Sequence, residues 1–368
     1  MNRAVATLIL ISITGTLIST AEQYAGWAVG HNTGGYATII HTIDSGNTWV
    51  RQGSGQVADV ALSGVFAVDP DTAWAVGNSV DGYGSIYRTT DGGQNWIRMG
   101  MGKTALAGKE LGKVHVNSTN IWVLGHGTIL YSSDGGTNWV DRIPAGYDNV
   151  LLQGLFSLGS TVWIGGEGTN THDYATMLKS TDTGRTWNRV TGGDITQANH
   201  ILGISAANAD TLWCVGGDGF LVFRSDDGGQ TWLRQPTPGA LGDANEVSAV
   251  DTNNVWVAVD NFIEWSTDGG SNWATHTTTY YTMGISAVNT QDVWAVINGE
   301  NPFIGKIYHT DTGGTNWQEQ TLTSGGPLAP LWTVSFAKQA VPEPGLIGTF
   351  TGLCLWVAAR CGRKKAQN

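Results

Sequence analysis

Short apolar segments alternate with Gly-rich turns along most of the 368-residue chain. Seven segments have the form Trp-Ala-Val-Gly or a close variant, at residues 27–30, 74–77, 122–125, 163–166, 213–216, 256–259 and 294–297. A second apolar segment precedes six of them, at residues 65–68, 114–116, 155–158, 204–206, 247–250 and 285–288. Short runs of β-branched and aromatic residues between turn residues are typical of buried strands. The pattern therefore predicts an all-β fold made of repeated hairpins.

Each Trp-Ala-Val-Gly segment is followed by a turn that ends in another Trp. These residues are Trp49, Trp96, Trp139, Trp187, Trp232, Trp273 and Trp317, with spacings of 47, 43, 48, 45, 41 and 44 residues. In the first six turns an Asp stands five residues before the Trp: Asp44, Asp91, Asp134, Asp182, Asp227 and Asp268. Asp311 stands six residues before Trp317, so we expect an extra residue to bulge the seventh turn.

The residue types in these turns predict a structural role. Asp accepts hydrogen bonds from backbone N–H groups of its own turn, and Gly adopts the positive φ that tight turns need. Fourteen of the 17 Trp residues belong to the two Trp motifs. We expect these indoles to pack between sheets and not to form a carbohydrate platform.

The repeat length matches one four-stranded blade of a β-propeller, about 40–45 residues. The first repeat has no apolar strand before Trp27, whereas the last one is followed by an additional strand at Leu331–Phe336. We therefore predict a single seven-bladed β-propeller with four-stranded blades. Its ring is closed by pairing of N- and C-terminal strands in one blade, which leaves no open edge between blades.

The two chain ends predict export. Residues 1–21 combine a cationic start, an apolar run and small residues before a cleavage point, as in a secretory signal peptide. Residues 22–338 form the predicted propeller. Residues 339–368 hold Pro342-Glu343-Pro344, an apolar stretch at 345–359 and a basic end. That stretch is shorter than the roughly 20 residues of a typical membrane span, so we expect transient membrane anchoring by a C-terminal helix.

Charge and composition exclude several functions. Removal of both ends takes five basic residues and no acidic one, so the formal charge falls from −11 to −16. Such a charge repels phosphate backbones, and no nucleic acid partner is expected. Cys214 would be the one cysteine left, which we interpret as a buried core residue. The eight His are scattered, so we predict no metal and no cofactor, with calcium binding left open.

Three resemblances follow from these motifs. The turns resemble the Asp box, or bacterial neuraminidase repeat, whose residues are structural in known propellers. The tail from Pro342 to Pro344 onward resembles the PEP-CTERM sorting signal. That resemblance implies export across the inner membrane of a Gram-negative bacterium by its secretion machinery and cleavage by an exosortase, with an uncut anchor as the alternative. Delivery to the outer envelope or the extracellular space would follow.

The Trp-Ala-Val-Gly and Asp-Gly-Gly-x-x-Trp phrases are similar to those of the photosystem II assembly and stability factor family. This resemblance implies a non-enzymatic scaffold that binds partner proteins. Sialidases, xyloglucanases and sortilin also carry Asp boxes. Arg142-Ile143-Pro144 follows the third turn and not the N-terminus as in sialidases, and no arginine triad is visible. We expect the arginines near the box Trp residues to cover outer strands with their charged heads in water.

We place the candidate ligand site on the face opposite the Asp-containing turns, because loops there vary most. Its polar and aromatic loop residues are Tyr36, Asp81, Tyr83, Glu110, Tyr147, Asp148, Glu167, His172, Asp173, Tyr174, Asp194, His200, Tyr280 and Tyr281. No spacing selects a carboxylate pair, so we predict no catalytic residue. The predicted function is a non-catalytic binding or scaffold propeller with a protein or exopolysaccharide ligand. A glycoside hydrolase or lyase that uses loop-face carboxylates is the alternative.

Overall fold

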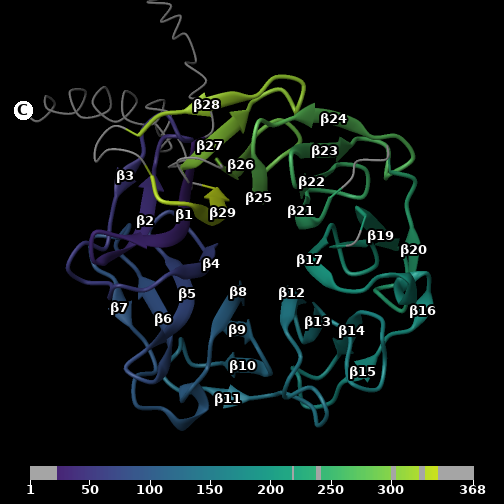
Figure 1. The fold of residues 1–368 in the computed structure, drawn as a ribbon, viewed down its shortest axis with the longest axis horizontal. Helices are drawn as coiled ribbons and strands as arrows, with labels where there is room; N and C mark the ends of the chain where they lie inside the picture. Colours follow the sequence, from purple (N-terminus) through teal and green to yellow (C-terminus); the bar gives the residue numbers. More distant parts are fainter. Residues whose placement is uncertain (1–22, 218, 238–241, 300–303, 323–327, 339–368) are drawn as a thin grey trace, which may run out of the picture.

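The computed structural model describes residues 23–217, 219–237, 242–299, 304–322 and 328–338. Seven sheets, each with four antiparallel strands, stand around a central channel, with one strand of each at the channel and the others successively farther out (Figure 1). This arrangement confirms the predicted seven-bladed β-propeller. Short 3-10 turns, η1 (Thr104–Leu106) and η2 (Ile195–Gln197), are the helical segments of the described residues. None of these described residues forms a helix long and apolar enough to cross a membrane.

We number the blades from the N-terminus and list their strands from the channel outward. Blade 1 consists of β29 (Leu331–Lys338), β1 (Tyr24–Thr33), β2 (Tyr36–Thr42) and β3 (Val50–Arg51). Blade 2 consists of β4 (Leu62–Ala67), β5 (Ala73–Val80), β6 (Tyr83–Thr89) and β7 (Ile97–Arg98). Blade 3 consists of β8 (Leu111–Asn117), β9 (Asn120–Gly125), β10 (Thr128–Ser132) and β11 (Val140–Asp141). Blade 4 consists of β12 (Leu152–Leu158), β13 (Thr161–Gly166), β14 (Thr176–Ser180) and β15 (Asn188–Arg189). Blade 5 contains β17 (Ile201–Ala206), β18 (Leu212–Gly216), β19 (Leu221–Ser225) and β20 (Thr231–Arg234). Blade 6 consists of β21 (Ala244–Ala249), β22 (Val255–Val259), β23 (Phe262–Ser266) and β24 (Ala274–Thr277). Blade 7 consists of β25 (Tyr281–Ala287), β26 (Val293–Asn298), β27 (Gly305–Thr310) and β28 (Gln318–Gln320). Blade 5 has a fifth strand, β16 (Gly192–Gly193), parallel to β20.

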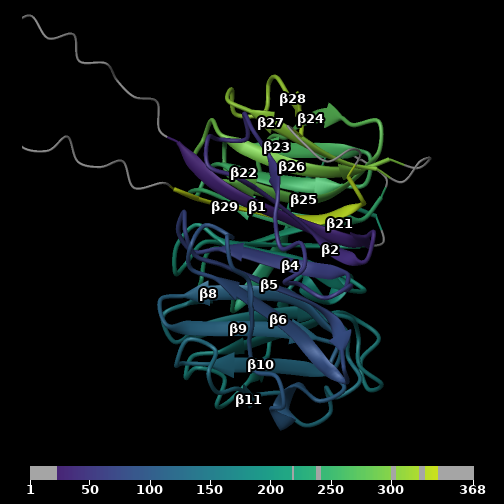
Figure 2. The ribbon, with the colours of Figure 1, turned by 90° about the vertical axis from the view of Figure 1, so that its left-hand side faces the viewer.

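The chain ends close the ring as predicted. Strand β29 pairs antiparallel with β1, and Trp27 lies opposite Ser335. The two strands run side by side along the edge of blade 1 (Figure 2). Tyr24 pairs with Lys338, so the described chain begins and ends at the same point of the ring. Residues 1–21 and the Pro342-Glu343-Pro344 tail lie outside the described residues.

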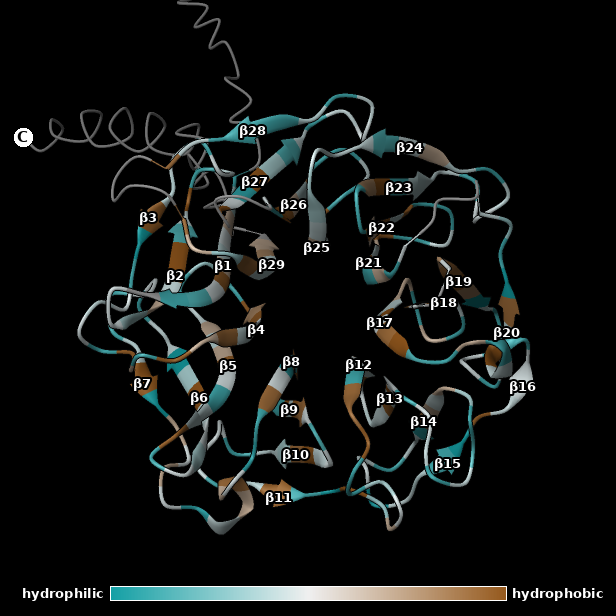
Figure 3. Ribbon diagram, viewed as in Figure 1, coloured by the Kyte–Doolittle hydropathy of each residue, from teal (hydrophilic) through white to brown (hydrophobic). Residues whose placement is uncertain are grey.

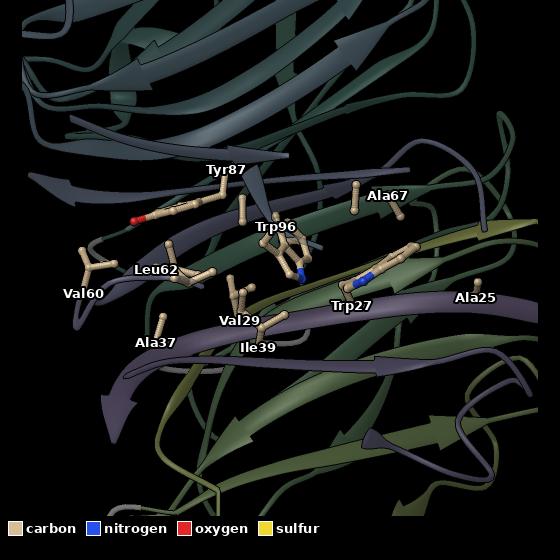
Figure 4. Close-up of a cluster of buried hydrophobic side chains, with 14 of the residues drawn as sticks. Ala25, Trp27, Val29, Ala37, Ile39, Val60, Leu62, Ala67, Tyr87 and Trp96 are labelled. Carbon is tan, nitrogen blue, oxygen red and sulfur yellow. The ribbon is translucent and has the colours of Figure 1, made fainter. Parts of the chain in front are cut away.

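Adjacent blades are held together by buried Trp residues. The first Trp of every blade is at most 2% exposed. Between blades 1 and 2, Trp27 and Trp96 lie among aliphatic side chains of both sheets (Figure 4). At three other interfaces the first Trp of one blade packs edge-on against the second Trp of the next, with ring centroids 6.5 Å apart for Trp74 and Trp139. Such pairs add about 0.5–1.5 kcal/mol beyond area burial. These indoles therefore pack between sheets, and Cys214 is buried as expected.

The outermost strands are short and differ in polarity between blades. In blades 1, 2, 3 and 5 they contain an exposed apolar residue, visible as brown segments of β3, β7, β11 and β20 in Figure 3. These residues are Val50, Ile97, Val140 and Leu233. Strands β15 and β28 begin instead with a polar residue. The described outer strands therefore carry exposed apolar side chains on four of the seven blades.

Candidate functional site

The turn between the third and fourth strand of each blade is a closed hydrogen-bond unit. In blade 1, the Oδ1 atom of Asp44 accepts the Thr48 N–H at 2.9 Å and the Thr42 hydroxyl at 2.8 Å. The Thr42 hydroxyl oxygen accepts the Gly46 N–H at 2.9 Å. Gly46 has φ of +83°, a conformation that side chains rarely adopt. The Asp carboxylate is therefore occupied by its own turn.

The same bonds recur at Asp91, Asp134, Asp182, Asp227 and Asp268. Hydrogen bonds from the turn lower the pKa of all six carboxyl groups, and at Asp182 the pKa falls to about 2. These groups stay ionised above pH 4 and stabilise the turns. In blades 2 and 4 to 7 this turn also bonds to the first-to-second turn of its own blade, for example through the Gly92 N–H and the Asp71 carbonyl at 2.9 Å. Both turns therefore share one face, as expected.

The prediction of a bulged seventh turn is wrong. Thr312, and not Asp311, occupies the position of the turn Asp, because its hydroxyl accepts the Asn316 N–H at 3.1 Å. The Thr310 hydroxyl accepts the Gly314 N–H at 3.1 Å, as Thr42 does for Gly46. The turn keeps its length, and Asp311 is an exposed side chain one position earlier. A hydroxyl replaces the carboxylate, so no extra residue is needed.

On the opposite face, every inner strand contains a β-bulge at the same position. In blade 2, Leu62 pairs with Gly77 and Gly64 with Val76, so Ser63 has no partner. The corresponding shifts in the other blades leave one residue unpaired each. The seven bulge residues are Ser63, Gly112, Gln153, Leu202, Asn245, Met283 and Trp332. A bulge re-aims a side chain out of the regular alternation.

All seven bulge residues line one pocket of about 410 Å³ at the end of the channel, which we call the mouth. Trp332, Met283 and Leu202 supply apolar surface from blades 1, 7 and 5. Gln153 and Asn245 supply amides, and the Asn245 amide donates to the Thr282 carbonyl at 2.9 Å. An apolar pocket with a few placed polar groups is the usual form of a ligand site.

The mouth ends at an ion pair that spans the channel. One residue beyond the bulge, four blades carry Gly, because a side chain there would meet the neighbouring strand. A Cβ on Gly64 would lie 2.7 Å from the Gly112 carbonyl oxygen, and one on Gly284 would lie 2.9 Å from the Thr333 Cα. The equivalent positions in blades 3 and 6 are Lys113 and Glu246, and their side chains form an ion pair.

Beyond the ion pair, four blades present serine hydroxyls to the channel. Each hydroxyl oxygen accepts a backbone N–H from the inner strand of the next blade, at 3.0–3.2 Å. We call Ser205, Ser248, Ser286 and Ser335 the serine belt. These bonds link blades 5, 6, 7, 1 and 2 through edge N–H groups that no strand covers.

The remaining blades present aromatic rings at the same level. Phe66, His115 and Phe156 form an arc, with ring centroids 4.7 Å and 4.8 Å apart. The Nδ1 atom of His115 lies 2.9 Å from the Ser157 hydroxyl oxygen. Burial lowers the pKa of His115 to about 4, so the imidazole is neutral at pH 7. The channel wall is therefore aromatic on one side and hydroxylic on the other.

Of the predicted loop residues, the structure brings Glu110 to the mouth. Its carboxylate accepts the Ser79 N–H at 3.0 Å and the Ser79 hydroxyl at 2.9 Å. The others are dispersed over the loops of the ring. Three of them contact arginine side chains: Asp81 pairs with Arg98, and Tyr147 and Tyr174 contact Arg189. The backbones of Glu167 and His200 form an isolated β-bridge, Asp194 accepts the Arg234 N–H, Tyr280 lies beside Lys306, and His172 bonds the neighbouring Thr residues. Tyr83 packs in the core between blades 2 and 3, whereas Tyr36, Tyr281, Asp148 and Asp173 are exposed.

Two arginines differ from the prediction of charged heads in water. The Arg98 guanidinium donates to the Val80 and Tyr83 carbonyls at 2.6 Å and 3.2 Å. Arg189 donates to the Tyr174 and Ala175 carbonyls in the same way. A guanidinium carries five donors in a fixed plane, which suits it to several loop carbonyls at once. These two arginines therefore order the second-to-third loops of blades 2 and 4.

Sequence reasoning missed Lys113, Glu246, Met283 and Trp332. A signal for the first two is present, since aligning the inner strands on their apolar residue places Lys113 and Glu246 where most repeats have Gly. The mouth residues carry no such signal, because a bulge is visible only in the pairing register. Among the residues that the structure describes, no group of three or more His, Cys, Asp or Glu side chains is placed to hold a metal ion.

The chain matches no family model and no curated protein sequence. It is similar in structure to YCF48 bound to D1 peptide, with a TM-score of 0.55 and 15% identity over 71% of this chain and 82% of that one. YCF48 from Cyanidioschyzon merolae is also similar, with a TM-score of 0.53 and 16% identity over 76% of this chain and 95% of that one. For the GH74 xyloglucanase from Xanthomonas campestris the TM-score is 0.56 and the identity is 13%, over 87% of this chain and 55% of the enzyme. Identities this low show the propeller fold alone.

Proposed function

We propose that this protein is an exported, non-catalytic binding propeller whose ligand docks at the mouth. The observation that carries the proposal is the repeated bulge, which aims one residue from every blade into a single pocket of about 410 Å³. Each bulge locally disrupts the hydrogen-bond ladder between two strands, so packing alone does not favour a bulge in all seven blades.

A protein ligand suits the mouth better than a polysaccharide. Trp and Met are among the residues enriched where proteins bind proteins, and Trp332 and Met283 belong to neighbouring inner strands, β29 and β25. They offer an apolar anchor site for one large side chain of a partner. The structural likeness to a propeller that holds a peptide supports this choice.

The carboxylates at the channel favour binding over hydrolysis. Glycoside hydrolysis needs two carboxyl groups facing each other across the scissile bond, about 5–9.5 Å apart. In the mouth, Glu110 is held by Ser79, while Glu246 is paired with Lys113 below it. The likeness to a GH74 xyloglucanase keeps a hydrolase or lyase as the alternative outcome of the test.

The place of the chain ends supports display with the mouth free. Tyr24 accepts the Ser45 N–H and lies on the face of the Asp-containing turns, beside Lys338. A tether through the C-terminal tail therefore attaches to that face, and the mouth points away from it. With the turns interpreted as Asp boxes and Pro342-Glu343-Pro344 as a PEP-CTERM signal, the protein is handed to an exosortase and reaches the outer envelope or the extracellular space.

The test compares immobilised wild-type protein with Trp332→Ala. Envelope proteins and exopolysaccharides of the source bacterium are passed over both, and bound material and released reducing ends are measured. We expect a protein that the wild type retains and Trp332→Ala loses, without reducing ends. The control is Leu233→Ser, which removes an exposed apolar residue of the outer rim and leaves retention unchanged.

Two outcomes contradict the proposal. Equal retention by wild type and Trp332→Ala places the ligand elsewhere on the ring. Release of reducing ends that Glu110→Gln or Glu246→Gln abolishes, with the fold intact, establishes a hydrolase or lyase instead.

A further inference from the structure

The part of the channel between the ion pair and the serine belt is a chamber of about 160 Å³, separate from the mouth. Lys113 lines both spaces and marks their boundary, whereas Glu246 lines the chamber only. An apolar cavity of about 150 Å³ in another protein holds a benzene molecule. The chamber therefore has room for a small organic molecule.

The chamber contains one positive and one negative charge. Its titratable residues are Lys113, His115 and Glu246, and the imidazole is neutral at pH 7. A ligand with a single charge would leave the chamber with a net charge, which is unfavourable in a site partly shielded from water. A ligand that carries both charges exchanges the internal ion pair for two new ones and keeps the site neutral.

The walls supply the other contacts. Ser205, Ser286 and Ser335 line the chamber, and each hydroxyl oxygen already accepts a backbone N–H. Among the described residues, none is bonded to the proton of these hydroxyls, so three O–H donors remain for a ligand oxygen. Hydrogen bonds to a carboxylate are stronger than those to a neutral acceptor. The aromatic arc opposite offers apolar surface.

We propose that the chamber is a binding site for a small zwitterion of the amino-acid type. The ligand carboxylate meets the Lys113 ammonium and the serine O–H donors, its ammonium meets the Glu246 carboxylate, and its apolar part lies against Phe66 and Phe156. This inference goes beyond the proposed function, because it concerns the space below the ion pair and no residue of the Trp332 side of the mouth.

The experiment measures thermal unfolding of the purified protein at pH 7 with three probes of similar shape and with glucose as a control. They are valine, 3-methylbutanoate, which lacks the ammonium, and isobutylamine, which lacks the carboxylate. We expect valine at saturation to raise Tm by at least about 2 °C, since a ligand bound to the folded state stabilises it, and neither analogue to do so. Equal shifts with all three, a shift with glucose, or no shift with any overturns the proposal.

Two serine variants separate binding from structure. Ser286→Ala and Ser248→Ala each remove one bond of the serine belt, but only Ser286 lines the chamber. We expect calorimetric affinity for valine to fall about tenfold in Ser286→Ala, which corresponds to the loss of one charge-assisted bond, and to stay unchanged in Ser248→Ala. Equal weakening in both variants assigns the belt a structural role alone. Retention of ligand at the mouth is measured separately and does not depend on this result.

Discussion

At the scale of single residues, Glu264 is a carboxylic acid where other blades have apolar side chains. In the pairing register its position corresponds to Ile40, Leu130 and Phe223. Glu264 is 1% exposed, and its carboxylate accepts the Thr275 hydroxyl at 2.8 Å. Burial raises its pKa to about 7 from 4.5, and the Thr275 bond opposes only part of that shift.

This raised pKa gives the protein a pH-dependent stability. The neutral carboxyl group is favoured in the folded state, so the stabilisation is full below about pH 4.5 and is lost as pH rises towards 7. We expect Glu264→Gln to raise the free energy of unfolding at pH 8 by roughly 1–3 kcal/mol and to change it little at pH 5. Urea unfolding at both pH values measures this, with exposed Asp173→Asn as the control. A gain of equal size at both pH values would argue against ionisation as the cause.

The turn residues allow a matched pair of substitutions. Asp227 accepts the Thr231 N–H, the Gln230 N–H and two hydroxyls, whereas Asp311 makes no such turn bond because Thr312 replaces it. We expect Asp227→Ala to lower the free energy of unfolding by about 1 kcal/mol, kept small by solvent around the turn, and Asp311→Ala to have no effect. The pKa of Asp227 is about 2, so this stabilisation is present above pH 4 and is lost as pH falls through 2. A larger loss in Asp311→Ala would contradict the assignment of Thr312.

At the scale of strands, the closing strand β29 is the element on which the ring depends. It covers the edge of β1 and contacts blade 7 through Phe336, which stacks on Trp294 at 3.8 Å between centroids. We expect a chain ending at Ala329 to lose its cooperative thermal transition, since β1 becomes an open edge. A chain ending at Lys338 serves as the control and keeps the native Tm. A native Tm in the shorter chain would refute the closure.

Strands and their order were predictable from sequence because apolar, β-rich segments repeat with one period. The functional part was less predictable. A bulge depends on which residues pair, and Leu202 or Met283 looks like any apolar strand residue in the sequence. The Lys113–Glu246 pair joins residues 133 positions apart, a contact that exists only because seven blades close around a common axis. The exposed loop carboxylates drew attention in the sequence, yet only Glu110 reaches the mouth.

At the scale of the whole molecule, the ring is held by one blade that contains both chain ends. The chain ends are held together there by the antiparallel pairing of β29 with β1, so the ring opens at blade 1 if these two strands separate. Tyr24 and Lys338 are paired, so a short linker joins the native ends without strain. Circular permutation therefore moves the shared blade to a new place or removes it.

Two permutants distinguish these cases. New ends at Ser118, between β8 and β9, leave blade 3 shared as blade 1 is in the native chain. New ends at Gly146, between blades 3 and 4, make every blade contiguous, and the ring then closes through side-chain packing alone. Because strand pairing within a shared blade offsets the entropy cost of bringing the chain ends together, we expect the Gly146 permutant to melt several degrees below the Ser118 permutant, whose Tm stays near the native value. Equal melting temperatures would mean that packing between blades, with its interlocked Trp residues, is sufficient to hold the ring.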